Sequence, residues 1–408
     1  MPHERLAGAL TATMEAMGRE GRLKGRETVF TGIVPASGRY GPRYRIESEG
    51  DRAFIRMNSN SYLGLSIEPA MIEAEECAVR AGGTGPGAVR FISGTWAAHT
   101  ALESRLARFH GREAATIFSS AYATVMGVLP ALVTPETAVI SDALNHSCII
   151  NATRLSAPKE KHVYPHNDMG ALERALEGAK KSCRRAVVVT DGVFSMRGDY
   201  APLDAIMEIA KRHDGDFAEN AIVMVDDSHG VGAFGATGRG TEEVTACPPV
   251  DILVGTLGKA FGVNGGYVAA DGAIVDYLRE TSPFYIYSNP ITPGEAAAAA
   301  RAVDIVDSGE GRALLGHLGA MTKKFEDGLV GLGFETLPGP HPIVPLLVRD
   351  TARTTQIVAH LRANGVLATG LNYPVVPRGD QTIRFQISAQ HTDADIDEVL
   401  GVLKTAPI

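Results

Sequence analysis

Five short apolar segments in the middle of the chain limit its fold more than any other feature. They are three to five residues long and lie at 115–118, 138–141, 186–190, 221–225 and 252–254. None alternates apolar and polar residues, which is typical of parallel strands buried on both faces of a sheet. Helical segments are predicted between them at 168–182, 202–213 and 272–280. This alternation predicts an α/β fold with an open, mostly parallel central sheet.

Reactive side chains follow these strands closely. They are His146, Ser195, Asp226, His229 and Lys259. In an open parallel sheet, ligands bind beyond the carboxyl ends of the strands. We therefore expect these five side chains to gather at one edge of the sheet and to form a site.

Lys259 lies in the segment GTLGKAFG (255–262), within about 20 residues that hold no other cation. A desolvated lysine has a lowered pKa, and its free amine can form a Schiff base with an aldehyde. The alternative is a surface lysine in a glycine-rich turn, and this segment alone does not decide between the two.

The other reactive residues fit one kind of cofactor, an aldehyde with a pyridine ring and a phosphate group. Asp226 ends a buried strand and could face the ring nitrogen, and His146 could stack on the ring. His229 and Ser195 could donate hydrogen bonds to its phenolic oxygen. The phosphate could bind where Ser119-Ser120 opens a helix, together with Thr256, because helix N-termini favour anions.

Two arginines are candidates for binding anionic groups. Arg384 lies on the predicted strand 382–387, on the face opposite Ile383 and Phe385, and could hold a substrate carboxylate. A surface ion pair is the alternative. Arg90 follows the glycine-rich segment 82–87 and could hold an anion there.

The remaining sequence suggests three parts: a helix and arm over residues 1–55, a large domain over 56–295 and a smaller C-terminal α+β domain over 296–408. The net charge of −8, with both signs mixed, argues against a nucleic-acid-binding protein. No apolar run approaches the ~20 residues that span a bilayer. The four cysteines lack metal-site spacing, so we expect no metal, free thiols and a cytoplasmic location.

The chain resembles the α-oxoamine synthases, which are pyridoxal-phosphate (PLP) enzymes of fold type I. The resemblance runs from about residue 50 to the C-terminus, and its motifs are NSNSYLGL (58–65), SGTWAAH (93–99), ISDALNHS (140–147), TDGVFSM (190–196), VDDSHGVGAFGATGRG (225–240), GTLGKAFG (255–262) and IRFQISAQHT (383–392). Within the family, HNDMGALE (166–173) and YPVVPRG (373–379) are most similar to the 2-amino-3-ketobutyrate CoA ligase branch. A relation to the 8-amino-7-oxononanoate synthase branch is the alternative.

The resemblance implies a Claisen-type condensation of glycine or another small α-amino acid with an acyl-CoA thioester. It implies that Lys259 is the Schiff-base lysine and removes the α-proton, and that Asn60 and Arg384 hold the amino-acid carboxylate. It also implies a homodimer with a shared active site, in which Ser288 reaches the partner's phosphate. The other implied cofactor-binding residues are Ser120, Ala121, Tyr122, His146, Ser195, Asp226, His229 and Thr256.

Two other readings remain open. One is a different fold type I reaction, such as transamination or aldol cleavage. The other is a non-catalytic PLP-binding sensor, which usually carries a DNA-binding module. Neither end of this chain offers a basic helix-turn-helix.

Overall fold

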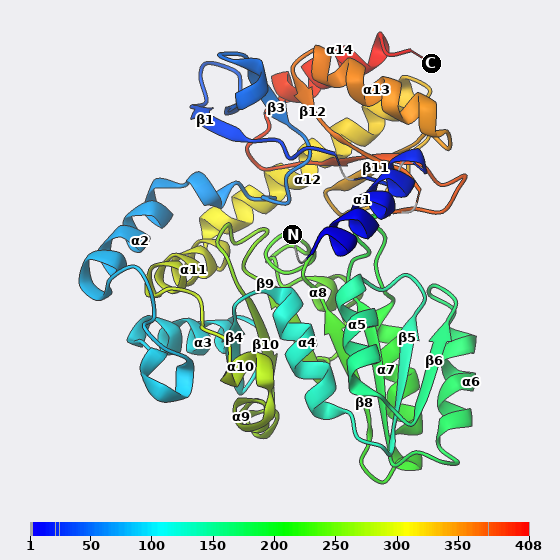
Figure 1. Cartoon of the computed structure of the whole chain (residues 1–408). Coiled ribbons are helices and arrows are strands. Elements are labelled where there is room, and N and C mark those ends of the chain that lie inside the picture. The colour runs from blue at the N-terminus through cyan, green and yellow to red at the C-terminus, as the bar shows by residue number, and fades with distance from the viewer. Residues whose placement is uncertain (1–2, 21, 24, 374, 408) are drawn as a thin grey trace. The chain divides into compact units, whose positions relative to one another are not determined.

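The computed structural model of the protein describes residues 3–20, 22–23, 25–373 and 375–407 (Figure 1). The chain folds into two compact units. Unit 1 consists of residues 1–59, 321–338 and 343–408, and unit 2 consists of residues 60–320 and 339–342. In the part of the chain that is described, no helix is both long enough and apolar enough to cross a membrane.

Unit 2 is built on a seven-stranded sheet with the strand order β4-β10-β9-β8-β7-β5-β6. The strands are β4 (Ala114–Phe118), β5 (Thr137–Asp142), β6 (Glu160–Tyr164), β7 (Arg185–Asp191), β8 (Ala221–Asp226), β9 (Ile252–Thr256) and β10 (Gly266–Ala270). Strands β5 to β9 run parallel, and β10 is antiparallel to both β4 and β9. The predicted α/β fold with a mostly parallel sheet is therefore confirmed.

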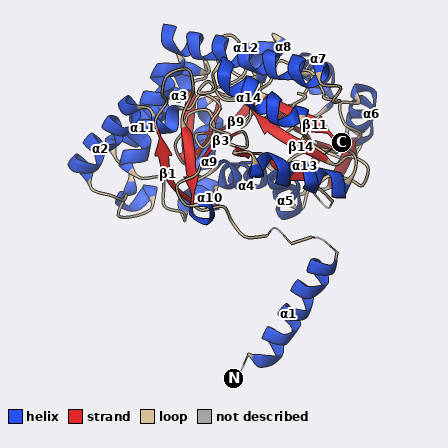
Figure 2. Ribbon diagram, turned by 90° about the horizontal axis from the view of Figure 1, so that it is seen from above, coloured by secondary structure: helices blue, strands red, loops and turns tan. Residues whose placement is uncertain are grey.

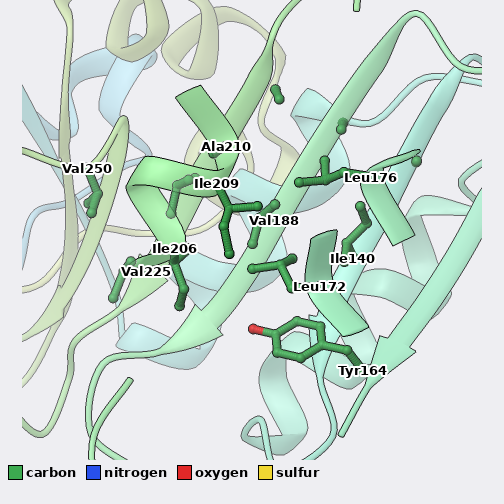
Figure 3. Close-up of a cluster of buried hydrophobic side chains, with 14 of the residues drawn as sticks. Ile140, Tyr164, Leu172, Leu176, Val188, Ile206, Ile209, Ala210, Val225 and Val250 are labelled. Atoms are coloured by element: carbon green, nitrogen blue, oxygen red, sulfur yellow. The ribbon is translucent and has the colours of Figure 1, made fainter. Parts of the chain in front are cut away.

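Each face of this sheet carries its own hydrophobic core. Ile140, Val188 and Val225 face the helices α6 (Met169–Ala179) and α7 (Leu203–His213), as Figure 3 shows. Their neighbours Val139, Val187 and Met224 pack instead against α4 (Ala121–Leu132) and α5 (Ser147–Ser156). Figure 2 shows α7 and α4 on opposite sides of the strands. Successive side chains of a strand point to opposite faces of the sheet. Because both faces are covered by helices, the side chains on both faces must be apolar, which explains the continuous apolar runs.

The other helical segments of unit 2 surround the ends of this sheet or connect its strands. They are η2 (Leu65–Ile67), α2 (Pro69–Gly82), the π-helical turn η3 (Arg90–Gly94), α3 (Ala97–Phe109), η4 (Asp214–Asp216), α8 (Thr241–Thr245), α9 (Gly272–Thr281), α10 (Pro283–Ile286) and α11 (Pro293–Val306). The long helix α12 (Gly309–Gly331) begins in unit 2 and ends in unit 1.

Unit 1 contains two smaller sheets. One has the order β1-β2-β3-β12 and the other has the order β11-β14-β13. The strands are β1 (Phe30–Val34), β2 (Arg43–Ile46), β3 (Ala53–Arg56), β11 (Ile343–Leu347), β12 (Val366–Leu367), β13 (Thr369–Leu371) and β14 (Thr382–Gln386). Its helices besides the end of α12 are α1 (Glu4–Arg19), η1 (Glu47–Glu49), α13 (Thr351–Ala363) and α14 (Asp393–Lys404).

Part of the predicted arm over residues 1–55 forms a sheet, because β1 and β2 are an antiparallel pair within it. These strands lack an alternating apolar pattern, and contacts between aromatic and cationic side chains hold them together instead. The Phe30 and Tyr44 rings meet edge to face at 5.9 Å, and the Arg56 guanidinium lies over both, 4.4 and 5.3 Å from their centres. Such cation–π contacts stabilise strands whose sequence shows little hydrophobic periodicity.

Candidate active site

One pocket of unit 2 contains most of the side chains that the sequence predicts to be reactive. It is lined by Ala121, Tyr122, His146, Cys148, Asp191, Val193, Ser195, Asp226, Ser228, His229, Thr256 and Lys259. Three parallel strands end in it, since Asp191, Asp226 and Thr256 are the last residues of β7, β8 and β9. The topology thus brings together residues that are up to 138 positions apart in the chain (Ala121 to Lys259).

Lys259 is half-buried on the turn that joins β9 to β10. Backbone hydrogen bonds close this turn, from Leu257 to Gly265 (3.0 Å) and from Gly262 to Lys259 (3.0 Å). Gly262 has a φ of +72°, and a Cβ atom there would lie 2.5 Å from the backbone nitrogen of Ser66. Only glycine fits this position without strain, so the glycines around Lys259 serve the tight turn that presents the lysine.

Two buried carboxyl groups lie side by side in the pocket. Asp191 and Asp226 are paired across the parallel strands β7 and β8. The Asp226 carboxylate accepts hydrogen bonds from the backbone nitrogen and the hydroxyl of Ser228, at 3.1 and 2.5 Å. Burial, followed by the charge of Asp226, raises the pKa of Asp191 well above its usual value. The two carboxyl groups therefore differ in their surroundings, because Asp226 accepts two hydrogen bonds from Ser228 and ionisation of Asp191 is disfavoured by burial.

The His146 ring is held at the start of α5. Its Nδ1 accepts a hydrogen bond from the backbone N–H of Cys148 (3.3 Å), and its own backbone N–H donates to Asp191 (2.9 Å). Burial is the main cause that lowers the pKa of His146, and the charge of Lys259 adds to it against the opposing charge of Asp226. The imidazole is consequently neutral at pH 7, and because Nδ1 accepts, its proton lies on Nε2.

His229 reaches the pocket from the loop after β8, and a buried tyrosine supports it. The Tyr62 hydroxyl lies 2.8 Å from His229 Nδ1. Tyr62 belongs to the polar turn after β3 and has no exposed surface. Ser195 lies on the turn after β7, which is closed by a backbone hydrogen bond from Phe194 to Asp199 (2.9 Å).

The helix α4 directs its N-terminus into the same pocket. Ala121 and Tyr122 form its first turn, where backbone N–H groups have no carbonyl partner within the helix. Ser120 is the N-cap, and its hydroxyl accepts from Ala123 (3.1 Å). Gly266 on β10 packs directly beneath, because a Cβ atom there would lie 2.3 Å from the Ala121 nitrogen. This close approach of strand and helix leaves the helix terminus open toward Thr256 and Lys259, where an anion can bind.

Comparison with known proteins identifies the family. The model of the aminotransferase class I and II family matches residues 52–403. The 8-amino-7-oxononanoate synthase of Geobacter sulfurreducens is 41% identical to this chain, and the matched region spans 88% of this chain and 90% of the relative. The mitochondrial 2-amino-3-ketobutyrate coenzyme A ligase of Bos taurus is 38% identical, with 96% and 90% coverage.

The chain belongs to the α-oxoamine synthases.

Solved structures agree with this assignment. The serine palmitoyltransferase of Sphingomonas wittichii superposes with a TM-score of 0.84 at 27% identity, over 97% of this chain and 96% of that one. A high-resolution structure of SPT with a PLP internal aldimine matches equally well, with a TM-score of 0.84 at 26% identity. As an α-oxoamine synthase, the protein is a PLP-dependent enzyme that condenses an amino acid with an acyl-CoA thioester.

The pocket of this α-oxoamine synthase fits PLP on its own chemistry. It presents one lysine amine for the aldehyde, a buried carboxylate for the ring nitrogen, and a neutral imidazole with an exposed face for the ring. The open terminus of α4 suits the phosphate. Among the described residues, no group of three or more histidine, cysteine, aspartate or glutamate side chains could hold a metal ion.

Four predicted residues do not line the pocket, and one of them is Ser120, the N-cap of α4. Ser288 is half-buried in the loop after α10, and Asn60 follows β3 at the start of unit 2. Arg384 lies on β14 of unit 1, opposite Pro345 of β11. Thr382 and Gln386, which share its face of the strand, are both buried.

The suggestion that Arg90 holds an anion is wrong. Its buried guanidinium forms a bidentate ion pair with Glu103, at 2.9 and 3.1 Å. Conversely, the sequence-based interpretation missed Asp191, Ser228 and the role of Cys148 in the pocket. Asp191 ends its strand as Asp226 does, so the same strand-end rule points to it. Cys148 offered no such signal beyond its place after His146.

Proposed function

We propose that the protein joins glycine or another small α-amino acid to an acyl-CoA thioester and releases CoA and an α-amino ketone. The presence of Lys259 and Asp226 in one pocket is the observation that carries this proposal. The names 8-amino-7-oxononanoate and 2-amino-3-ketobutyrate, given to the products of two relatives, both describe a ketone next to an amino-bearing carbon. The shared chemistry of the relatives thus supports the reaction. The two product names differ in the carbon chain around these groups, so the acyl chain and the amino acid are the substrates to be tested.

The roles of the pocket residues follow from their positions. Lys259 would bind the cofactor aldehyde and, once displaced by the substrate amine, take the proton from the substrate α-carbon. The bound cofactor supplies the electron-withdrawing ring that stabilises the resulting carbanion. Asp226 would hold a proton on the ring nitrogen, and His146 would stack on the ring. His229 and Ser195 would donate hydrogen bonds to the phenolic oxygen.

The phosphate would lie at the start of α4, on Ala121 and Tyr122, with Ser120 and Thr256 beside it. We also propose that Asn60 and Arg384 bind the amino-acid carboxylate. A second copy of the chain would complete the site as a homodimer, with Ser288 reaching the partner's phosphate. The four free thiols are in keeping with a cytoplasmic location.

Replacement of Lys259 tests the core of this proposal. Wild-type protein should bind PLP with a visible absorption band and should release free thiol from acyl-CoA only when an amino acid is present. Lys259→Ala should lose both, whereas Lys323→Ala, at an exposed position of α12, should keep both. Thiol release that does not depend on the amino acid would contradict the condensation.

A panel of amino acids crossed with acyl-CoA thioesters of different chain length, including a dicarboxylic one, would identify the substrates. The ketone product would be measured by mass. Amino-group transfer to a keto acid without thiol release would favour the aminotransferase alternative instead.

A further inference from the structure

The buried imidazole of His341 contacts His229, which lines the pocket. His341 belongs to the short segment 339–342, which is part of unit 2 although the residues on both sides of it belong to unit 1. Its side chain has no exposed surface. Its Nε2 lies 2.9 Å from the backbone carbonyl oxygen of His229.

The surroundings of His341 fix its charge and its tautomer. The Tyr62 and Phe234 rings meet it edge to face, with centres at 5.5 and 5.3 Å. Burial, aided by the charge of Lys259, lowers the pKa of His341 to about 4 despite the bond to the His229 carbonyl. The ring is thus neutral at pH 7. Because a carbonyl can only accept, its one proton lies on Nε2.

His229 is consequently held at two points by residues far from it in the chain. The Tyr62 hydroxyl is bonded to its ring, and His341 donates to its backbone carbonyl. This carbonyl belongs to the turn after β8, in which the backbone N–H groups of Gly230 and Val231 both donate to the Asp227 carbonyl (2.9 Å each). A hydrogen bond of this kind contributes about 0.5–1.5 kcal/mol, so the donation from His341 helps to hold the turn.

We propose that His341 is a positioning residue of the active site, which fixes the backbone of His229 so that the His229 ring meets the cofactor in a set orientation. This proposal rests on the proposed function, because it concerns how His229 contacts the phenolic side of PLP. A neutral donor is required here. A lysine or an arginine would place a second positive charge close to Lys259.

Two substitutions separate the hydrogen bond from simple packing. His341→Gln places an amide N–H near the position of Nε2 and retains the donor. His341→Phe fills similar space without it. His110 serves as a control, since it is also buried and neutral in unit 2 but bonds to the Tyr267 hydroxyl (2.7 Å) and does not line the pocket.

The readouts are the affinity of the apoprotein for PLP, the pH midpoint of the visible band of the cofactor on Lys259, and the thermal unfolding of the apoprotein. His341→Phe should bind PLP about 10-fold more weakly and shift the pH midpoint, whereas His341→Gln should stay close to wild type. His110→Phe should lower thermal stability and leave the pH midpoint unchanged.

Three results would overturn the proposal: an unchanged midpoint and affinity in His341→Phe, equal defects in the Gln and Phe variants, or the same spectral shift in His110→Phe. A wild-type protein without the visible band would instead refute the proposed function, and this inference with it. If His341→Phe does not fold, ¹⁵N-histidine NMR of the wild type decides. His341 should stay neutral and protonated on Nε2 from pH 6 to 9, and the opposite tautomer would refute its role as donor.

Discussion

Asp191 and Asp226 end neighbouring parallel strands at the same register position, and their partners give them different roles. Asp226 accepts two hydrogen bonds from Ser228 and one from the Cys148 thiol (3.4 Å), whereas Asp191 accepts one from the backbone of His146. Two adjacent buried carboxyl groups do not readily ionise together. The hydrogen bonds therefore favour the negative charge on Asp226 over Asp191, and Asp191 supports the backbone of His146.

Amide substitutions should separate these two roles. Asp191→Asn retains a side-chain oxygen that accepts from the His146 N–H and carries no charge, so PLP binding and turnover should change only a few-fold. If Asp226 faces the ring nitrogen as proposed, Asp226→Asn removes a negative charge there and should lower kcat about 100-fold or more. Steady-state thiol release and PLP titration measure both. Equal losses in the two variants would show that the charge is not confined to Asp226.

The turn that carries Ser195 should lose support at alkaline pH. His166 bonds to Asp142 (3.1 Å) and to Asp199 (3.2 Å), which belongs to that turn. Burial opposes protonation, but the bonds to Asp142 and Asp199 outweigh it and raise the pKa of His166 to about 9. Since the unfolded value is about 6.5, the stabilisation is complete below pH 6.5 and is lost as the pH rises through 9. A difference of about 2.5 pKa units corresponds to about 3.4 kcal/mol, and because the ring is partly exposed, solvent screening lowers this stabilisation to roughly 1–2 kcal/mol.

Denaturant unfolding between pH 6 and 10 measures this effect. The free energy of unfolding of the wild type should fall more steeply than that of His166→Gln, which bonds to the same groups but does not titrate. Parallel curves for the two proteins would exclude a contribution from His166.

Gly266→Ala should damage the phosphate end of the pocket. The new methyl group would meet the backbone of Ala121, which cannot move without displacing α4. Overpacking of this kind costs about 1–3 kcal/mol. Thermal stability and PLP affinity should both fall. The control is Gly178→Ala on α6, where no atom lies within 4 Å of the added carbon and stability should be unchanged or higher. Normal PLP binding by Gly266→Ala would argue against phosphate binding at α4.

The cysteines should differ sharply in reactivity. Cys77 is exposed, whereas burial and the charge of Asp226 raise the pKa of the Cys148 thiol, whose S–H donates to Asp226. Because the thiolate is the reactive form, a disulfide reagent at pH 8 should modify Cys77 at once and Cys148 only after unfolding. Peptide mapping identifies the labelled residues. Rapid labelling of Cys148 in the native protein would contradict the buried thiol.

Sequence patterns predicted the parallel strands because each is buried on both faces and therefore continuously apolar. They missed β6, an edge strand whose Glu160, Lys161 and His162 look like a polar loop, and β10, which is antiparallel. They also led to the pocket, since strand ends carry Asp226, His146 and Lys259. They did not lead to the contact between Tyr62 and His341, because a contact between segments almost 280 residues apart leaves no local pattern.

The turn that carries Lys259 links β9 and β10, which pair directly from Thr256 and Gly266 onward. Both ends of the turn are consequently fastened to the centre of the sheet, and the backbone of the lysine has little freedom to swing. If Lys259 binds the cofactor as proposed, only its four side-chain torsions need to change when a substrate amine displaces it. Rotations of this kind take picoseconds to nanoseconds, so the lysine can leave and return many times within one turnover without setting its rate.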